Sequence, residues 1–183
     1  MSRIFLVWIL LLIQSGYFCQ SRIQISDRKI TKSTQTIQDD RKVHTLKEIV
    51  TYYNKKGDPV EIIERINGVF SQKILYSYNK NGDEKTNCHI DSLGNVIDIK
   101  TFYYDTFGNS LGYSLENANH EKQEELIIEL NKFNDKISES IFDANHILKT
   151  KTIFVYDNKG LLIEKKTYNG NNELIYWKIT NYE

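Results

Sequence analysis

Two histidines end the same tripeptide, Ala-Asn-His, and stand 26 residues apart, at His120 and His146. Imidazole is a common zinc ligand, and turns that are two strands apart lie about 10 Å from each other. Each nitrogen would have to reach within about 2 Å of the ion, and no third ligand accompanies the pair. We therefore expect exposed turn histidines and no metal site.

Aspartates also recur beside the expected turns, which invites a calcium-binding or catalytic interpretation. A calcium loop needs several carboxylates that converge on one ion, and each turn here offers one or two. An Asp or Asn that opens a turn caps its own backbone. That structural role accounts for every copy, at Asp91, Asp105, Asp143 and Asp157.

The sequence does not support nucleophilic catalysis either. His89 follows Cys88 directly, so on a strand the two side chains point to opposite faces. The sequence has no Gly-x-Ser-x-Gly elbow, no phosphate loop and no dinucleotide fingerprint. We expect no catalytic residue, no cofactor and no enzyme activity. An enzyme built on scattered carboxylates is the alternative that stays open, because paired acids meet in space and not in order.

Residues 1–19 are predicted to be a cleaved export signal. Residues 4–13 form an apolar run of about ten residues, too short to span a bilayer. Cleavage is expected near Cys19 or just after Ser21, with lipid attachment at Cys19 as the alternative. The mature protein would act in the periplasm, on the outer surface or outside the cell, with no membrane span and with Cys88 as its one cysteine.

From residue 44 onward the chain is a tandem repeat with a period of 26 residues. Four consecutive units have this length without gaps, the first unit is one residue shorter, and a half unit ends the chain. Residues 20–43 precede the repeat as a linker or an irregular first strand. The units are 44–68, 69–94, 95–120, 121–146 and 147–172, followed by the half unit 173–183.

Turn-forming residues occupy two fixed positions in each unit. Gly and Asn are expected there because they tolerate the positive φ of tight turns. Where His120 and His146 hold the second position, we expect the preceding Asn119 and Asn145 to take the left-handed conformation. The predicted structural turn residues are Gly57, Gly68, Gly82, Gly94, Gly108, Asn134 and Gly160.

The segments between turns have the length of strands, and their apolar residues alternate. Sequential strands joined by tight turns form an antiparallel meander. Ten turns imply about eleven strands, and a sheet of that width curls or closes. The predicted fold is all-β, with tandem 26-residue β-hairpin repeats forming a wide, curled antiparallel meander sheet.

Residues 121–141 carry a competing signal. Their apolar residues fall at helical spacing, and the surrounding Glu and Lys have good helix propensity. The stretch 131–135 nevertheless aligns with the turn at 79–83, and an inserted helix would match the repeat length only by coincidence. We predict strands in this segment.

The repeated motif Tyr-x-Tyr-Asp/Asn-x-x-Gly resembles that of the YD-repeat (Rhs-type) family. It is seen as Tyr76-Ser77-Tyr78-Asn79-Lys80-Asn81-Gly82, as Phe102-Tyr103-Tyr104-Asp105-Thr106-Phe107-Gly108 and as Phe154-Val155-Tyr156-Asp157-Asn158-Lys159-Gly160. The resemblance covers residues 44–183 and is greatest to short exported bacterial tandem-repeat proteins. In larger Rhs and teneurin-type relatives such repeats build a spiralling β-shell that can enclose a toxin domain.

Two function classes follow. The first is a non-enzymatic exported binding or scaffold module at the bacterial cell envelope or outside the cell, with a protein or glycan partner. The second, which the resemblance suggests, is an accessory or immunity protein of a polymorphic toxin system. Basic and acidic residues number 24 each, so no charge excess favours nucleic acid as a partner.

The last strand, 174–182, is predicted to be the main binding surface. It is apolar on both faces, and an edge strand of that kind pairs with something. We expect Tyr176, Trp177 and Tyr182 to contribute to binding, and the same edge offers strand-mediated self-association.

Overall fold

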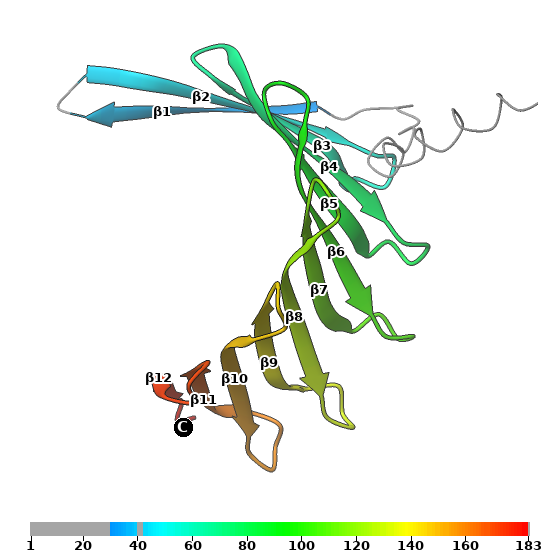
Figure 1. The fold of residues 1–183 in the computed structure, drawn as a ribbon, viewed down its shortest axis with the longest axis vertical. Coiled ribbons are helices and arrows are strands. Elements are labelled where there is room, and N and C mark those ends of the chain that lie inside the picture. The colour runs from blue at the N-terminus through cyan, green and yellow to red at the C-terminus, as the bar shows by residue number, and fades with distance from the viewer. Residues whose placement is uncertain (1–29, 40–41, 183) are drawn as a thin grey trace, which may run out of the picture. The chain divides into compact units, whose positions relative to one another are not determined.

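The computed structural model describes residues 30–39 and 42–182, with side chains described from residue 47 onward, and these ranges contain twelve β-strands and no helix. Each strand is hydrogen-bonded to the next one in sequence, so the order is that of a simple meander (Figure 1). The predicted all-β meander is confirmed, with one strand more than the count of turns suggested. The strands are β1 (Ile30–Asp39), β2 (Lys42–Tyr53), β3 (Pro59–Ile66), β4 (Val69–Tyr78), β5 (Glu84–Ile90), β6 (Val96–Tyr104), β7 (Ser110–Asn117), β8 (Lys122–Leu130), β9 (Lys136–Asp143), β10 (Leu148–Tyr156), β11 (Leu162–Asn169) and β12 (Leu174–Ile179).

The chain divides into two compact units between Leu75 and Tyr76. The first holds β1 to β3 and most of β4, and its β1 is a ten-residue strand paired antiparallel with β2, with a register shift between Ile37 and Gln38. The second holds the end of β4 and all of β5 to β12. Within this second unit the strands turn steadily from β5 to β12, which gives that part of the sheet its curl (Figure 1).

The segment with the helical signal forms two strands and a turn, so the prediction of strands is confirmed. β8 and β9 pair antiparallel, from Glu124 opposite Asp143 to Leu130 opposite Lys136. Phe133, which contributed to the helical spacing, lies at the tip of the turn and is 71% exposed. The helical pattern arose because two strands and a short turn together place apolar residues at mixed intervals.

Nine turns between residues 54 and 173 share one five-residue structure. The third residue after the opening Asn or Asp donates its N–H to the opening carbonyl, and the opening N–H bonds the carbonyl of the fifth residue. The Oδ1 atom of the opening side chain accepts two further N–H groups, as Asp105 Oδ1 does from Phe107 and Asn109 at 2.8 and 2.9 Å. These bonds satisfy the turn backbone, so the recurring Asp and Asn residues have the capping role that was predicted for them.

The first and fifth residues of seven of these turns also bond each other through their side chains. Where the first residue is Asn the fifth is Asp or Glu, as in Asn131 Nδ2 donating to Asp135 Oδ2 at 3.0 Å. The roles are reversed at Asp105, whose Oδ2 accepts from Asn109 Nδ2 at 2.8 Å. One amide always meets one carboxylate, so each of these turns avoids placing two carboxylates together.

Positive φ is found at the fourth residue of the turns. All seven predicted structural turn residues have positive φ, from 67° at Asn134 to 99° at Gly82, and six of them are the fourth residue of a five-residue turn. His120 and His146 adopt it themselves, at 62° and 60°, so the expectation that Asn119 and Asn145 would do so is wrong. The turn hydrogen bonds fix which residue is fourth, and that constraint overrides the preference of Asn for this conformation. The β3–β4 connection differs, since Asn67 and Gly68 form a two-residue hairpin loop with positive φ at both.

Both faces of the second unit carry apolar side chains. Cross-strand pairs place Phe102, Tyr113 and Ile128 on one face, here called the Tyr113 face. The opposite one, the Ser138 face, carries Phe142 together with two small polar side chains that are nearly inaccessible, since Ser114 and Ser138 are only 2% and 4% exposed. No large side chain described here is fully buried. The sheet is therefore held together mainly by its ladder and by cross-strand contacts, not by a deep core.

Tyr113 shows how such contacts are made. Its ring lies edge-on to Phe102 with centroids 6.1 Å apart, and the Lys100 ammonium lies 4.1 Å from its centroid. Its hydroxyl donates to Glu124 Oε1 at 2.8 Å. Burial, followed by this hydrogen bond and the charge of Glu124, raises the pKa of Tyr113 to about 12.

Cys88 is the most buried hydrophobic residue, at 3% exposed, and no free cysteine is found among the described residues. Cys88 is disulfide-bonded in the structure. The expectation of a single cysteine concerns the chain after removal of Cys19, which lies outside the described residues together with the rest of the predicted export signal, and it stays a prediction.

The second Tyr of the Tyr-x-Tyr-Asp motif has a structural purpose that repeats along the sheet. Three of these tyrosines donate their hydroxyl to the backbone carbonyl twenty residues earlier, at the start of a preceding strand. The pairs are Tyr104 with Glu84 at 2.8 Å, Tyr156 with Lys136 at 2.9 Å and Tyr182 with Leu162 at 3.0 Å. The bond ties the end of one strand to the start of the neighbouring strand that precedes it, which explains why the motif needs Tyr and not merely an aromatic ring.

Leu130 holds the aligned position in the one unit that lacks this tyrosine, which gives a direct test. Leu130→Tyr is expected to place a hydroxyl near the Ser110 carbonyl and to raise the free energy of unfolding by about 0.5–1.5 kcal/mol. Leu130→Phe supplies the same ring without the hydroxyl. Denaturant unfolding of both variants isolates the hydrogen bond, and equal stability of the two would show that no such bond forms.

Acid titration should separate turns opened by Asp from those opened by Asn. The side-chain hydrogen bond from Asn109 is the main cause that lowers the pKa of Asp105. A lowered pKa gives stability that is present above the unfolded value of about 3.9 and is lost as pH falls toward the folded one. Asp105→Asn should keep the turn, because Asn opens five others, and should flatten the dependence of the melting temperature on pH in that range.

The reciprocal control is Asn131→Asp, which brings a second carboxylate to Asp135. This variant should be less stable than the parent at neutral pH and should recover as pH falls, because protonation removes the repulsion. Parallel pH profiles for the parent and both variants would contradict the account of these turns.

Candidate interaction surfaces

β12 is the last strand of the sheet, and β11 is its one hydrogen-bonded neighbour among the described strands. Thr180 N donates to the Ile163 carbonyl at 2.9 Å, so the N–H groups of Thr180, Lys178 and Tyr176 point toward β11. The N–H groups of Ile179 and Trp177 then point away from the sheet. This outer edge of β12 is a row of backbone donors and acceptors that is open to another strand.

All six residues of β12 are exposed, which is unusual for so apolar a strand. The exposed fraction is 48% for Tyr176, 55% for Trp177 and 59% for Ile179. Pairing with β11 places Tyr176 opposite Thr167 on the Tyr113 face and Trp177 opposite Lys166 on the Ser138 face. The two aromatic residues that were predicted to bind therefore lie on opposite sides of the strand.

Each of the three predicted binding residues already has a contact within the sheet. Trp177 Nε1 donates to Glu164 Oε1 at 2.8 Å, and the Lys165 ammonium lies 6.0 Å from the Tyr176 ring centroid. Tyr182 donates its hydroxyl to the backbone, as described above. These contacts orient the rings and leave about half of each surface exposed.

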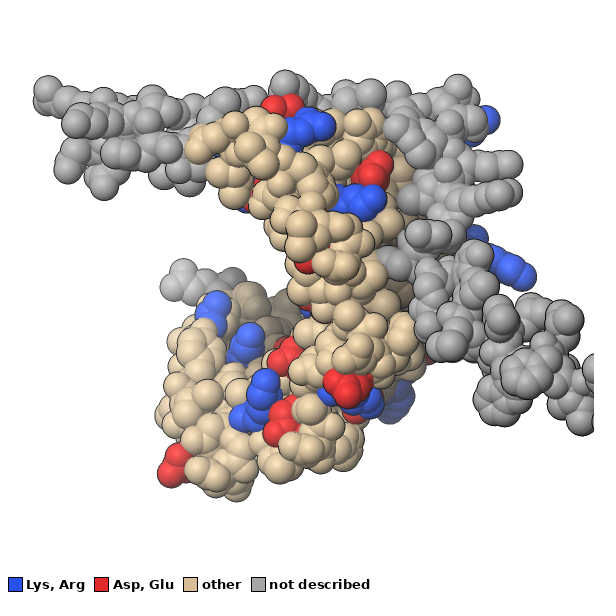
Figure 2. Space-filling model, turned by 45° about the horizontal axis from the view of Figure 1, so that its top comes forward, with Lys and Arg blue, Asp and Glu red and all other residues tan. Residues whose placement is uncertain are grey.

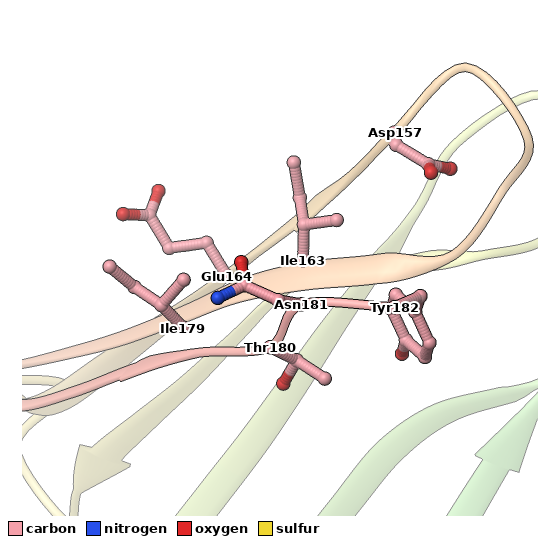
Figure 3. Close-up of a pocket in the computed structure, with 7 residues that line it drawn as sticks. All are labelled: Asp157, Ile163, Glu164, Ile179, Thr180, Asn181 and Tyr182. Atoms are coloured by element: carbon pink, nitrogen blue, oxygen red, sulfur yellow. The ribbon is translucent and has the colours of Figure 1, made fainter.

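An open hollow of about 450 Å³ lies beside the end of β12 (Figure 3). Glu164 and Ile179 lie close together in the close-up, with Tyr182 at the other end and Asp157 beyond it on the β10–β11 turn. The hydrogen bonds from Lys166 and Trp177 lower the pKa of Glu164. The ionised carboxylate of Glu164 is thus favoured by its neighbours, and the other acid that lines the hollow is Asp157 on the β10–β11 turn.

Sequence reasoning missed a second exposed feature, at the tips of two turns that are neighbours on the same edge of the second unit. Phe107 and Phe133 are each the third residue of a turn, and they are 84% and 71% exposed. The β6–β7 and β8–β9 turns lie in one row along the second unit (Figure 1), two strands apart, which is about 10 Å. Comparison of the units could have found them, because the same position is Asn81 and Lys159 in the flanking units.

His120 and His146 do not converge with other ligands. His120 Nδ1 lies 3.4 Å from Glu116 Oε2, whereas His146 lies 3.4 Å from Glu125 Oε2 and stacks on Phe142 with centroids 4.5 Å apart. Within the described ranges no three His, Cys, Asp or Glu side chains are arranged to hold a metal ion. The same ranges contain no helix that is long and apolar enough to cross a membrane.

Charged side chains of both signs are interspersed on the face of the second unit that Figure 2 shows. Ion pairs within this unit join charges of opposite sign, such as Lys149 of β10 with Glu124 of β8 at 3.3 Å. Mixed charge of this kind offers no extended basic or acidic patch on that face. The exposed apolar residues of β12 and of the turn tips are more distinctive features of the second unit.

No protein-family model matches the chain, and a search of curated proteins finds no relative. Among solved structures, the Tc holotoxin pore of Photorhabdus luminescens aligns with 80% of this chain and 9% of its own, at 11% identity and a TM-score of 0.43. A porin-like protein from Bacteroides uniformis aligns over 82% of this chain and 96% of its own, at 11% identity and a TM-score of 0.30. At these TM-scores the matches carry no argument about function. The resemblance to the YD-repeat family rests on the sequence motif.

Proposed function

We propose that this chain is a non-enzymatic binding or scaffold module that acts outside the cytoplasm, in the periplasm, on the outer surface or outside the cell. The observation that supports the proposal is the exposure of large aromatic side chains at fixed points of a repeat sheet, above all Phe107 and Phe133 at neighbouring turn tips. Exposed aromatic rings on a rigid frame are favourable contacts for a protein or a glycan. The apolar run near the N-terminus supports export.

Binding is tested with purified protein against a panel of envelope glycans and exported proteins, by calorimetry. The double variant Phe107→Ser, Phe133→Ser is expected to weaken binding by about tenfold or more, because two central aromatic contacts are lost. Leu93→Ser is the matched control, since Leu93 is 84% exposed at a turn tip of the opposite row. Binding that both variants weaken equally, or turnover of a panel member, would contradict the proposal.

Export is tested separately by fusing residues 1–29 to a phosphatase that folds only outside the cytoplasm. Activity of the fusion is expected, and loss of activity when Leu10→Arg interrupts the apolar run is the control. A toxin gene beside this one would instead favour the accessory or immunity alternative.

A further inference from the structure

The two edges of the sheet are of complementary kinds. Every neighbouring pair in the meander joins an even-numbered strand to an odd-numbered strand. Even-numbered strands such as β4 and β6 are followed by the first turn of a repeat unit, the turn that contains Gly82 or Gly108. Among the described strands, those with one neighbour are β12, which is even, and β1, which is odd. The outer edge of β12 is therefore the edge that β10 offers to β11, and β1 is a strand of the class that fills such an edge.

We propose that β12 of one copy pairs antiparallel with β1 of a second copy, so that the meander continues from chain to chain. The inference deepens the proposed function, on which it rests only in taking β12 as a binding surface. The occupant is a second copy because the repeat itself supplies both halves of the contact. Such an interface is heterologous, so each added copy presents a fresh edge and the assembly grows head to tail.

The repeat also specifies the register of this pairing. β1 pairs with β2 as β11 pairs with β12, which aligns Gln35 with Thr167 and Ser33 with Lys165. In the β10–β11 pair, Thr152 lies opposite Thr167 and Phe154 opposite Lys165. β12 lies one 26-residue unit after β10, so Lys178 corresponds to Thr152 and Thr180 to Phe154. If β12 pairs with β1 of the next copy as β10 pairs with β11, Lys178 lies opposite Gln35 and Thr180 opposite Ser33.

The chemistry of the two strands suits this register. The same alignment brings Tyr176 to the register position opposite Ile37, and Ile179 to the position opposite Thr34; aromatic and β-branched residue types of this kind are enriched in strands. Lys178 is the single charged residue in β12, and its register position is opposite Gln35. Pairing would also cover the exposed side chains of β12, which otherwise stay in contact with water.

Cysteine cross-linking tests both the contact and its register. Lys178→Cys and Gln35→Cys proteins are mixed and oxidised, and the linked peptides are mapped, with the unsubstituted protein as background for its own two cysteines. Linked dimer is expected at a level at least about tenfold above a mixture of Lys178→Cys with Thr31→Cys, because residue 31 lies about 13 Å along the strand from residue 35. Equal linkage at both positions, or linkage of residue 178 to residue 178, would overturn the proposal.

Ile179→Pro provides a second and independent measurement. The N–H that proline removes points away from β11, so the fold should survive with its melting temperature nearly unchanged while the outer edge is blocked. Sedimentation of the parent protein should show a mass that rises with concentration beyond a dimer, and the variant should stay monomeric. A parent that is monomeric at all concentrations, or that forms the 35–178 link only within one doubly substituted chain, rejects the second copy as the occupant. Neither measurement depends on Phe107 or Phe133, so failure here is distinguishable from failure of ligand binding.

Discussion

Gly112→Ala is expected to lower the free energy of unfolding by about 2–4 kcal/mol, although it adds a single methyl group within a strand. A Cβ at residue 112 would lie 1.9 Å from the carbonyl oxygen of Leu126 and 2.8 Å from its carbonyl carbon. Both atoms belong to the backbone of the neighbouring strand, so no side chain can rotate away. The φ of Gly112 is 127°, which an L-residue rarely adopts, so strain adds to the clash.

Gly108→Ala is the matched control for this prediction. Its φ is 89°, but a Cβ there would meet no atom nearer than Asp83 Oδ2 at 3.9 Å. Strain alone should cost about 1 kcal/mol, and the melting temperature should fall by only about 2–4 °C. Denaturant unfolding of the two variants separates close strand approach from backbone strain. Equal losses would mean that β7 and β8 can move apart at little cost.

Gly112 also marks the limit of what the sequence could predict. The repeat placed the strands and turns correctly, because turn residues and alternation are local properties that a period of 26 residues makes visible. Gly112 has Ser138 at the aligned position of the next unit, so no recurring glycine identified it. Its role depends on the distance between two backbones, which no pattern within one strand reports.

Some features of the candidate surfaces could be predicted from the sequence and others could not. The exposed apolar character of β12 follows from its composition and its place at the end of the repeat, and both could be predicted. The hydroxyl bond of Tyr182 to Leu162 could not, because it joins residues twenty positions apart and depends on where the ring lies against the neighbouring strand. Comparison of the units could have singled out Phe107 and Phe133, whereas the turn hydrogen bonds show that each is the third residue of its turn, at the tip.

Removal of one whole unit should leave a folded protein, whereas removal of half a unit should not. Deletion of residues 96–121 joins Asn95 to Lys122 and preserves the complete turn from Asp91 to Asn95, including the Asn95 side-chain bond to Asp91 at 3.2 Å. β5 is then followed by β8, an even strand in place of β6. Each repeat unit contacts chiefly its neighbours, so the shorter sheet should unfold cooperatively with reduced strand content.

Deletion of residues 96–109 preserves the same turn but joins β5 to β7. Consider the residue that lies seven positions after the first residue of a turn. In an even strand it is on the Tyr113 face, as Asp98 is after Asp91, and in an odd strand it is on the Ser138 face, as Gly112 is after Asp105. When an odd strand follows an odd strand, the side chains of every later strand therefore move to the opposite face of the sheet, because the period of side chains along a strand is two residues. The Tyr113 face of one half would then continue as the Ser138 face of the other.

That inversion is the reason for expecting a large difference between two deletions of similar position. Circular dichroism and denaturant unfolding should show one cooperative transition for the 96–121 deletion and for its control, deletion of residues 122–147, which keeps the turn from Asn117 to Glu121 intact. The 96–109 deletion should lose cooperativity or fail to fold, even though it removes fewer residues. If it instead unfolds as cooperatively as the whole-unit deletions, the two faces are interchangeable, and the contacts of Tyr113 and Ser138 do not determine how neighbouring strands fit together.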